Sequence, residues 1–279
     1  FGDLYKPFDG PRRCARLPGP PYHFMTRVTD YKGDVGDFRS GVGIEMIYEI
    51  PSDAWYFEKN GYPVMPFAVF LEAALQPCGW LASASGSALS VDKELFFRNL
   101  DGRGILKAEL PPDAGVLETH VTMTQVSKSA GMIIESFSVR CYCKGVEIYE
   151  LETVFGFFPK AALENQVGLT TSPESKSKAM AATNYSVDLS ARPARYFEGS
   201  ARLADPMLCM LDRVTAFEPN GGENGLGWLR GEKDVDPGEW FFKAHFFQDP
   251  VQPGSLGIEA MIQLLQFYMI EAGLDEGLS

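Results

Sequence analysis

The sequence repeats itself at an interval of 185 to 187 residues, and this repeat constrains the fold more than any other feature. Four short motifs occur twice, in the same order and with nearly constant spacing. They are Arg27-Val28-Thr29 with Arg213-Val214-Thr215, Trp55-Tyr56-Phe57 with Trp240-Phe241-Phe242, Pro63-Val64-Met65-Pro66 with Pro250-Val251-Gln252-Pro253, and Leu71-Glu72-Ala73 (followed by Gln76) with Ile258-Glu259-Ala260 (followed by Gln263). Such self-similarity indicates two copies of one structural unit in tandem.

The repeat divides the chain into three expected parts. Residues 1–160 form the first unit, 161–196 a linker rich in serine and threonine, and 197–279 the second unit. Because the chain starts with Phe1, we expect a piece of a longer polypeptide. We also expect the second unit to lack the strands that follow the helix in the first unit.

Each copy contains one long apolar segment, at residues 67–83 and 255–272. The second segment is apolar nearly all round, which predicts a helix buried on most sides. The first segment predicts a helix that is interrupted near Pro77. Five runs enriched in β-branched and aromatic residues follow it, separated by turns such as Asp101-Gly102, and they predict antiparallel strands. The runs are residues 95–98, 104–110, 117–127, 132–143 and 146–158. The fold class is therefore α+β.

Composition excludes several classes of protein. A net charge of -12 and a pI near 4.8 argue against a nucleic-acid-binding protein, which usually carries a basic surface. Glutamate and glutamine interrupt the longest apolar stretch, and no signal peptide opens the chain, so we expect no membrane span. The five cysteines lack metal-ligand spacing. We expect free thiols, no bound metal and a cytoplasmic location.

The repeats differ at a residue suited to proton transfer. The second copy has His245 between Trp240 and Pro250, whereas the matching segment of the first copy is two residues shorter and has no histidine. Both copies keep an acid in the apolar helix, Glu72 and Glu259. A carboxylate in such a helix is costly unless it is paired or neutralised, so both acids require an explanation. The other histidines, at positions 23 and 120, lie in no motif, and we interpret them as structural.

The segment from Trp240 to Tyr268 resembles the active-site segment of the FabA-like β-hydroxyacyl-thioester dehydratases of fatty-acid synthesis. It shares their histidine, the Asp-Pro-Val-X-Pro-Gly turn, and an acid five residues after that glycine. The stretches MLCMLDRV and LFFRNLDG are similar to the dehydratase domains of polyunsaturated fatty acid synthases and related polyketide synthases. The resemblance implies a tandem double hot-dog, in which an antiparallel sheet wraps a central helix in each copy, with the second copy truncated. It also implies an active site that pairs His245 with Glu72, and a vestigial site that pairs Glu259 with the region of Asn60.

Dehydration of a 3-hydroxyacyl thioester requires a base at C2, an acid for the departing C3 hydroxyl and hydrogen-bond donors for the thioester oxygen. A neutral imidazole, here His245, suits the first task, and a carboxyl such as Glu72 with its pKa raised by an apolar site suits the second. The backbone N–H of Gly254 at the start of a helix is an oxyanion donor without an intrahelical partner. Gln76, one turn after Glu72, is placed to orient the carboxyl. Glu259 is either a vestigial or an alternative acid, and the chemistry requires no cofactor.

We therefore expect a dehydratase that converts a 3-hydroxyacyl chain on acyl carrier protein to the trans-2-enoyl thioester. The resemblance implies neighbouring synthase domains as further partners and leaves a homodimer open. In the family that the chain resembles, dehydratases that also isomerise the new double bond commonly carry aspartate as the acid, whereas glutamate is more typical of those that only dehydrate. Both copies have glutamate, and isomerisation stays open. Two basic clusters are candidates for binding an acidic carrier protein, namely Arg12, Arg13 and Arg16 and also Arg192, Arg195 and Arg202.

Two other functions remain open. A hot-dog acyl-thioester hydrolase would release free acid and thiol, but the Asp-Pro-Val-X-Pro-Gly turn with its upstream histidine argues against it. A scaffold domain of a synthase would carry out no chemistry, and His245 argues against that interpretation of the second copy.

Overall fold

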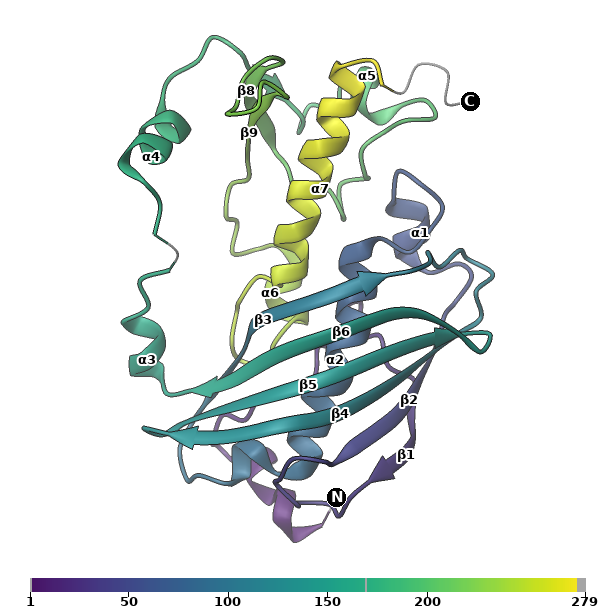
Figure 1. Ribbon diagram of the computed structural model, residues 1–279, viewed down its shortest axis with the longest axis vertical. Helices are drawn as coiled ribbons and strands as arrows, with labels where there is room; N and C mark the ends of the chain where they lie inside the picture. The colour runs from purple at the N-terminus through teal and green to yellow at the C-terminus, as the bar shows by residue number, and fades with distance from the viewer. Residues whose placement is uncertain (1, 169, 275–279) are drawn as a thin grey trace. The chain divides into compact units, whose positions relative to one another are not determined.

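The computed structural model describes residues 2–168 and 170–274 (Figure 1). The chain forms two compact units. Unit 1 comprises residues 1–54, 69–166 and 238–253, and unit 2 comprises residues 55–68, 167–237 and 254–279. Each unit therefore includes a short segment from the other sequence repeat. The boundaries expected after residues 160 and 196 divide the chain by its sequence repeats and not by its compact units. These boundaries stay a prediction.

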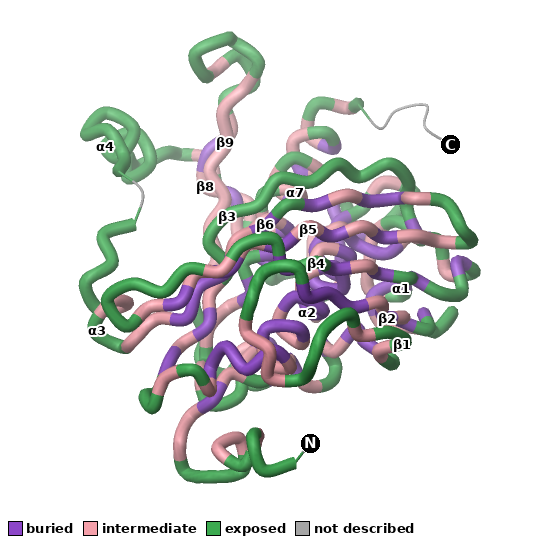
Figure 2. Tube along the Cα trace, turned by 60° about the horizontal axis from the view of Figure 1, so that its bottom comes forward, coloured by how far each residue is buried: buried purple, intermediate pink, exposed green. Residues whose placement is uncertain are grey.

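Unit 1 is built on a six-stranded antiparallel sheet in the order β1-β2-β4-β5-β6-β3. Its strands are β1 (Arg27–Lys32), β2 (Gly43–Glu49), β3 (Phe96–Leu106), β4 (Val116–Ser129), β5 (Met132–Cys143) and β6 (Val146–Phe158). Along β5, buried positions alternate with half-buried ones (Figure 2), as expected for a strand with one face turned to a core.

Helix α2 (Phe67–Ser85) runs along the inner face of this sheet (Figure 1). Its small residues Ala74, Cys78 and Ala82 are fully buried, which lets the helix approach closely. Phe70 packs against Tyr149 of β6, with 5.1 Å between ring centroids. An antiparallel sheet around a central helix confirms the expected hot-dog fold. Unit 1 also contains η1 (Asp3–Phe8), η2 (Ser87–Leu89), α3 (Lys160–Glu164) and α6 (Trp240–Ala244).

Two local expectations about this unit are wrong. Helix α2 continues through Pro77, because burial of the helix compensates for the one backbone hydrogen bond that proline removes. Most of the run 95–98 and the first part of the run 104–110 belong to the single strand β3, which ends at Leu106, so Asp101-Gly102 is not a turn. The register of β3 against β6 shifts at a bulge between Asn99 and Asp101, and there Thr153 Oγ1 donates to the Asp101 carbonyl at 2.8 Å.

The described residues of unit 2 form a three-stranded antiparallel sheet and the long helix α7 (Gly254–Glu271). The strands are β7 (Val187–Asp188), β8 (Arg213–Glu218) and β9 (Trp228–Glu232), and β7 comes from the segment expected to be a linker. The core gathers Leu189, Tyr196, Phe197, Leu203, Leu211, Val214, Phe267 and Ile270. The unit also contains α1 (Trp55–Lys59), α4 (Pro173–Met180) and α5 (Ala194–Phe197).

The structure confirms the repeat. Helices α2 and α7 begin at Phe67 and Gly254, which are equivalent in the sequence repeat. Strands β1 and β8 also correspond, and both have a register shift at the equivalent threonine, between Val28 and Asp30 and between Val214 and Ala216. The shared bulge, in addition to the shared elements, supports the double hot-dog architecture.

Helix α7 differs from α2 on one face. Met261, Leu265 and Met269 are 64%, 61% and 38% exposed. Their counterparts in α2 are Ala74, Cys78 and Ala82, which are fully buried. The expectation that this helix is buried on most sides is therefore wrong for this stripe. The reason is that β4, β5 and β6, which cover α2, have no counterparts among the described residues of unit 2.

One helical stretch of the described chain, residues 67–89, is long and apolar enough to cross a membrane, with a mean hydropathy of 1.2. The composition of the chain predicted no such span. This stretch comprises α2 and η2, and 61% of its apolar window is buried inside the protein. Packing under the sheet of unit 1 accounts for its apolar character.

The inner face of β5 also buries a carboxyl group, Glu135, at the end of α2. Ser87 Oγ donates to its Oε1, while Oε2 has no hydrogen-bond partner among the described residues. Burial raises the pKa of Glu135 to about 7, although the Ser87 hydrogen bond and the charge of Lys128 act in the opposite direction. The neutral acid is therefore the form that the fold prefers.

Protonated Glu135 is expected to make stability fall as pH rises. Its folded pKa of about 7 lies above the model-peptide value of 4.5, so the folded state binds more protons between these values. Relative to Glu135→Gln, the free energy of unfolding of the wild type should drop by about 2–3 kcal/mol between about pH 5 and about pH 8. Urea unfolding of both proteins at the two pH values measures this difference. A constant difference would show that Glu135 is ionised throughout.

Candidate active site

A segment of the second repeat brings His245 into unit 1. Helix α6 ends at Ala244, and His245 follows as its C-cap, with its N–H donating to the Phe241 carbonyl at 2.9 Å. The Ala244 carbonyl accepts from the N–H of Gly19 at 2.7 Å, which joins the segment to the N-terminal part of the unit. His245 and Glu72 therefore belong to the same compact unit although they come from different repeats.

The His245 ring is fixed by its surroundings. It is 8% exposed and stacks on Phe246, with 3.9 Å between ring centroids and 25° between planes. Nδ1 lies 2.9 Å from the carbonyl oxygen of Val251. A carbonyl can only accept, so Nδ1 carries the proton of the neutral ring and Nε2 is left with its lone pair.

Burial keeps this imidazole neutral. The pKa of His245 is lowered from 6.5 to about 4; burial is the largest cause, and the positive charge of Arg98 acts in the same direction. The hydrogen bond to Val251 and the negative charge of Asp249 oppose this shift. At neutral pH the ring is therefore a proton acceptor at Nε2, which is the state that a general base requires.

Glu72 lies in the second turn of α2 and is buried. Gln76, one turn further on, donates from Nε2 to the Tyr22 carbonyl and accepts at Oε1 from the Phe24 N–H, both at 2.8 Å. The Tyr22 ring lies edge-on to His245, with 6.4 Å between centroids. Tyr22 thus connects the helix that carries Glu72 to the segment that carries His245. The predicted role of Gln76 in orienting Glu72 stays a prediction.

Replacing Gln76 by leucine is expected to destabilise the protein by about 2–4 kcal/mol, because two buried backbone groups lose their partners. Chemical denaturation measures this change. Gln166→Leu, at an exposed position of the same unit, is the matched control and should leave the free energy of unfolding unchanged. Equal stability of wild type and Gln76→Leu would contradict the structural role.

Unit 2 contains the counterpart of this arrangement. Gln263 donates to the Leu208 carbonyl and accepts from the Met210 N–H, at 2.8 and 2.7 Å, as Gln76 does with Tyr22 and Phe24. Gln263 Nε2 also lies 2.8 Å from Glu259 Oε1. Burial raises the pKa of Glu259, and this hydrogen bond partly offsets the effect.

In unit 2 the position of the base is occupied by an amide. Asn60 Nδ2 donates to the Val64 carbonyl at 3.0 Å, and Val64 is the counterpart of Val251. Asn60 Oδ1 accepts from the Gly61 N–H at 2.9 Å. Asn60 therefore reproduces the hydrogen bond of His245 but cannot take up a proton. That the site is vestigial stays a prediction.

Gly254 is the first residue of α7 and belongs to unit 2. By helix geometry its N–H has no intrahelical acceptor. Its predicted role as an oxyanion donor is not tested by this geometry and stays a prediction.

Sequence reasoning did not identify Arg98 and Asp249 as part of this region. Arg98 on β3 forms a two-point ion pair with Asp249, with Nη1–Oδ2 2.6 Å and Nη2–Oδ1 3.2 Å. Arg98 belongs to LFFRNLDG and Asp249 to the Asp-Pro-Val turn, so both lay within motifs, but nothing in the sequence indicated their contact. A small hollow beside the pair is lined by Arg13, Ala15, Leu95, Phe96, Phe97, Phe246, Phe247 and Asp249.

The predicted carrier-binding arginines are largely engaged within the protein. Arg12 donates to the Ala88 carbonyl, Arg16 to that of Phe8, and Arg13 lies over the Phe96 ring. In unit 2, Arg192 pairs with Asp205 and Arg195 with Glu271, while Arg202 donates to the Gly199 carbonyl. A role in binding a carrier protein stays a prediction.

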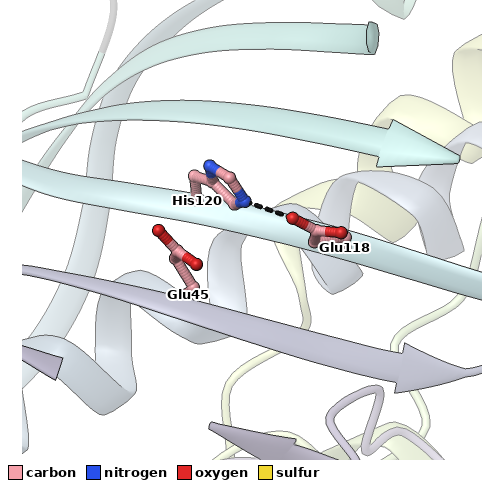
Figure 3. A group of neighbouring side chains, drawn as sticks. All are labelled: Glu45, Glu118 and His120. Atoms are coloured by element: carbon pink, nitrogen blue, oxygen red, sulfur yellow. Dashed lines mark hydrogen bonds and ion pairs between the residues drawn. The ribbon is translucent and has the colours of Figure 1, made fainter. Parts of the chain in front are cut away.

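One group of side chains has metal-ligand character, on the outer face of the unit 1 sheet. Glu45, Glu118 and His120 have ligand atoms within 4.8 Å of one another (Figure 3). His120 Nε2 lies 2.5 Å from Glu118 Oε1, and Lys32 Nζ lies 2.5 Å from Glu45 Oε1. Each of the three side chains thus has a polar or charged partner within the protein, and the expectation of no bound metal stays a prediction. All five cysteines are free, as expected.

Comparison with known proteins identifies relatives of the chain. A family model described as a FabA-like domain matches residues 17–152 and 203–279. One of the proteins that make up the polyunsaturated fatty acid synthase of Thraustochytrium sp. (strain ATCC 26185 / S-3) is 30% identical over 246 residues, or 81% of this chain. The chain spans 16% of the length of that relative.

Solved structures show weaker similarity. The dehydratase heterocomplex ApeI:P of Xenorhabdus doucetiae is 14% identical, with 54% of this chain and 99% of that chain covered and a TM-score of 0.41. A thioesterase-like protein of Shewanella oneidensis is 10% identical, with 42% and 76% covered and a TM-score of 0.32. At these TM-scores, the similarities do not bear on the function.

Proposed function

Because the chain belongs to the FabA-like domain family, we propose that it removes water from a 3-hydroxyacyl thioester to give the trans-2-enoyl thioester. The observation that carries this proposal is the state of His245. Its Nδ1 is committed to the Val251 carbonyl and its pKa is lowered to about 4, so Nε2 is a neutral base. Buried Glu72 in the same compact unit is the proposed acid.

In the proposed reaction, His245 Nε2 takes the proton from C2 while the C3–O bond breaks. Protonated Glu72 gives its proton to the departing hydroxyl, which leaves as water. The products are the enoyl thioester, an imidazolium and a carboxylate, and transfer of the proton back to Glu72 completes the cycle. We further propose that the backbone N–H of Gly254 donates a hydrogen bond to the thioester oxygen, where negative charge develops. Every proton has a donor and an acceptor, so the proposal includes no metal or redox cofactor.

The proposed substrate is carried on the phosphopantetheine arm of an acyl carrier protein. The name of the relative, as part of a polyunsaturated fatty acid synthase, supports carrier-bound acyl chains and neighbouring synthase domains as partners. The proposal includes a cytoplasmic location and leaves a homodimer open. The acidic composition gives no support to a nucleic-acid partner.

The proposal is tested by incubating the protein with a 3-hydroxydecanoyl thioester and following the mass of the acyl chain. Loss of water with the thioester retained is the expected result, and chromatography against 2-enoyl and 3-enoyl standards identifies the position of the double bond. Release of free acid would indicate a hydrolase instead. An unchanged substrate, with protein shown to be folded by circular dichroism, would favour the scaffold function.

A further inference from the structure

The ion pair between Arg98 and Asp249 joins two parts of unit 1 that are 151 residues apart in sequence. Their side chains are 22% and 16% exposed, so water screens the pair only in part. Both carboxylate oxygens are engaged, and Arg98 Nη1 also donates to the Phe97 carbonyl at 2.8 Å. Two parallel contacts fix the orientation of the carboxylate relative to the guanidinium as well as the distance between them, whereas a single contact fixes only the distance.

Asp249 lies in the turn that supplies the hydrogen-bond partner of the base. The turn runs from Phe246 to Val251, and its only internal backbone contact described is from the Asp249 N–H to the Phe246 carbonyl, at 3.4 Å. Gln248 has a φ of 57°, a left-handed conformation that is unfavourable for a residue other than glycine. Such a turn requires support from its surroundings. Arg98 provides this support from β3, a strand that is itself hydrogen-bonded to β6.

The first repeat provides an internal comparison. The residue before the proline of its matching turn is Tyr62 instead of aspartate, and Tyr62 is exposed. That repeat carries Asn60 where the second carries His245. The aspartate thus occurs in the repeat that has a base to position, and is missing from the one that has none.

From these contacts we infer that Arg98 is a positioning residue for His245. Through Asp249 it holds the turn 246–251, so that the Val251 carbonyl accepts from Nδ1 and Nε2 is the nitrogen presented to the substrate. This inference rests on the proposed dehydratase function for its kinetic consequence. Its structural consequence, the protonation of one ring nitrogen over the other, is independent of that function.

The test uses Arg98→Gln and Asp249→Asn, with Arg140→Gln as the matched control. Arg140 lies on β5 of the same sheet, is 37% exposed, and has three looser ion pairs of 3.8 to 4.0 Å. Nitrogen-15 NMR of the histidine side chains at neutral pH reports the tautomer of His245. We expect the wild type and Arg140→Gln to show the Nδ1–H form, and the other two variants to show a mixture of both tautomers.

In the dehydration assay, Arg98→Gln and Asp249→Asn are expected to lower kcat by about 10–100-fold, with KM changed less than about threefold, because a small displacement of the base affects the chemical step. The exchanged pair, Arg98→Asp with Asp249→Arg, should recover part of the loss. Arg98→Lys, which keeps one contact, should lie in between.

An unchanged His245 tautomer in folded Arg98→Gln and Asp249→Asn would overturn the inference, and Asp249→Asn alone decides if Arg98→Gln does not fold. If the wild type shows no dehydration, the proposed function fails, but the NMR comparison still decides whether Arg98 positions the ring. If the tautomers change and kcat does not, the positioning role in catalysis is wrong.

Discussion

Replacing His245 by asparagine is expected to lower kcat for dehydration by about 10²–10⁴-fold, the usual contribution of a general base. Asparagine is chosen because the first repeat already carries it. Asn60 donates to the Val64 carbonyl as His245 donates to that of Val251, so the variant can keep the local hydrogen bond. What it loses is Nε2, the proton acceptor. The fold and substrate binding should therefore survive, and KM should change little.

The measurement is the initial rate of water loss from a 3-hydroxyacyl thioester, with circular dichroism to confirm folding. His120→Asn is the matched control, because His120 is on the outer face of the sheet and pairs with Glu118. It should have the rate of the wild type. A His245→Asn variant with the wild-type rate would remove the observation on which the proposed function depends.

The architecture could be predicted from the sequence because it is encoded in repeated patterns. Two copies of one motif series predicted two units, and the two long apolar segments predicted helices α2 and α7. The equivalence of Gln76 and Gln263 is also visible in the sequence, and both bridge a carbonyl and an N–H of an upstream segment in the structure. Such contacts recur because the backbone groups they satisfy recur with the fold.

Other features depend on partners that are distant in sequence. Pro77 inside α2 is unfavourable locally, and only its packing under the sheet explains why the helix continues. Asp101-Gly102 has the composition of a turn, but pairing of β3 along β6 overrides that preference. The apolar residues of α7 gave no sign that Met261 and Leu265 would be exposed, since exposure depends on which strands cover the helix.

The pairing of Arg98 with Asp249 is the clearest case of information missing from the sequence. Each residue lies in a different motif, and the sequence around each is typical of a charged residue at the protein surface. Only the fold brings them within 2.6 Å of each other. The support that we infer for the turn around Val251 therefore comes from a strand outside the segment that contains the histidine.

Two matched substitutions decide which glutamate is the acid. Glu72→Gln is expected to lower kcat by about 10²–10⁴-fold, because the amide cannot protonate the departing hydroxyl. Glu259→Gln is expected to keep the rate within about twofold, since in unit 2 the equivalent of the base is Asn60, which cannot accept a proton. Rates of water loss from the same 3-hydroxyacyl thioester measure both effects.

The two glutamates are a stringent comparison because both are buried, both lie in the second turn of a central helix, and both are followed by glutamine one turn later. General effects of removing a buried acid should therefore be similar in the two variants. A difference in rate then reports the chemistry and not the packing. The reverse result, an inactive Glu259→Gln and an active Glu72→Gln, would mean that the acid comes from the same repeat as the base or from a second chain. In that case the exchange of segment 238–253 into unit 1 would position His245 without supplying its catalytic partner.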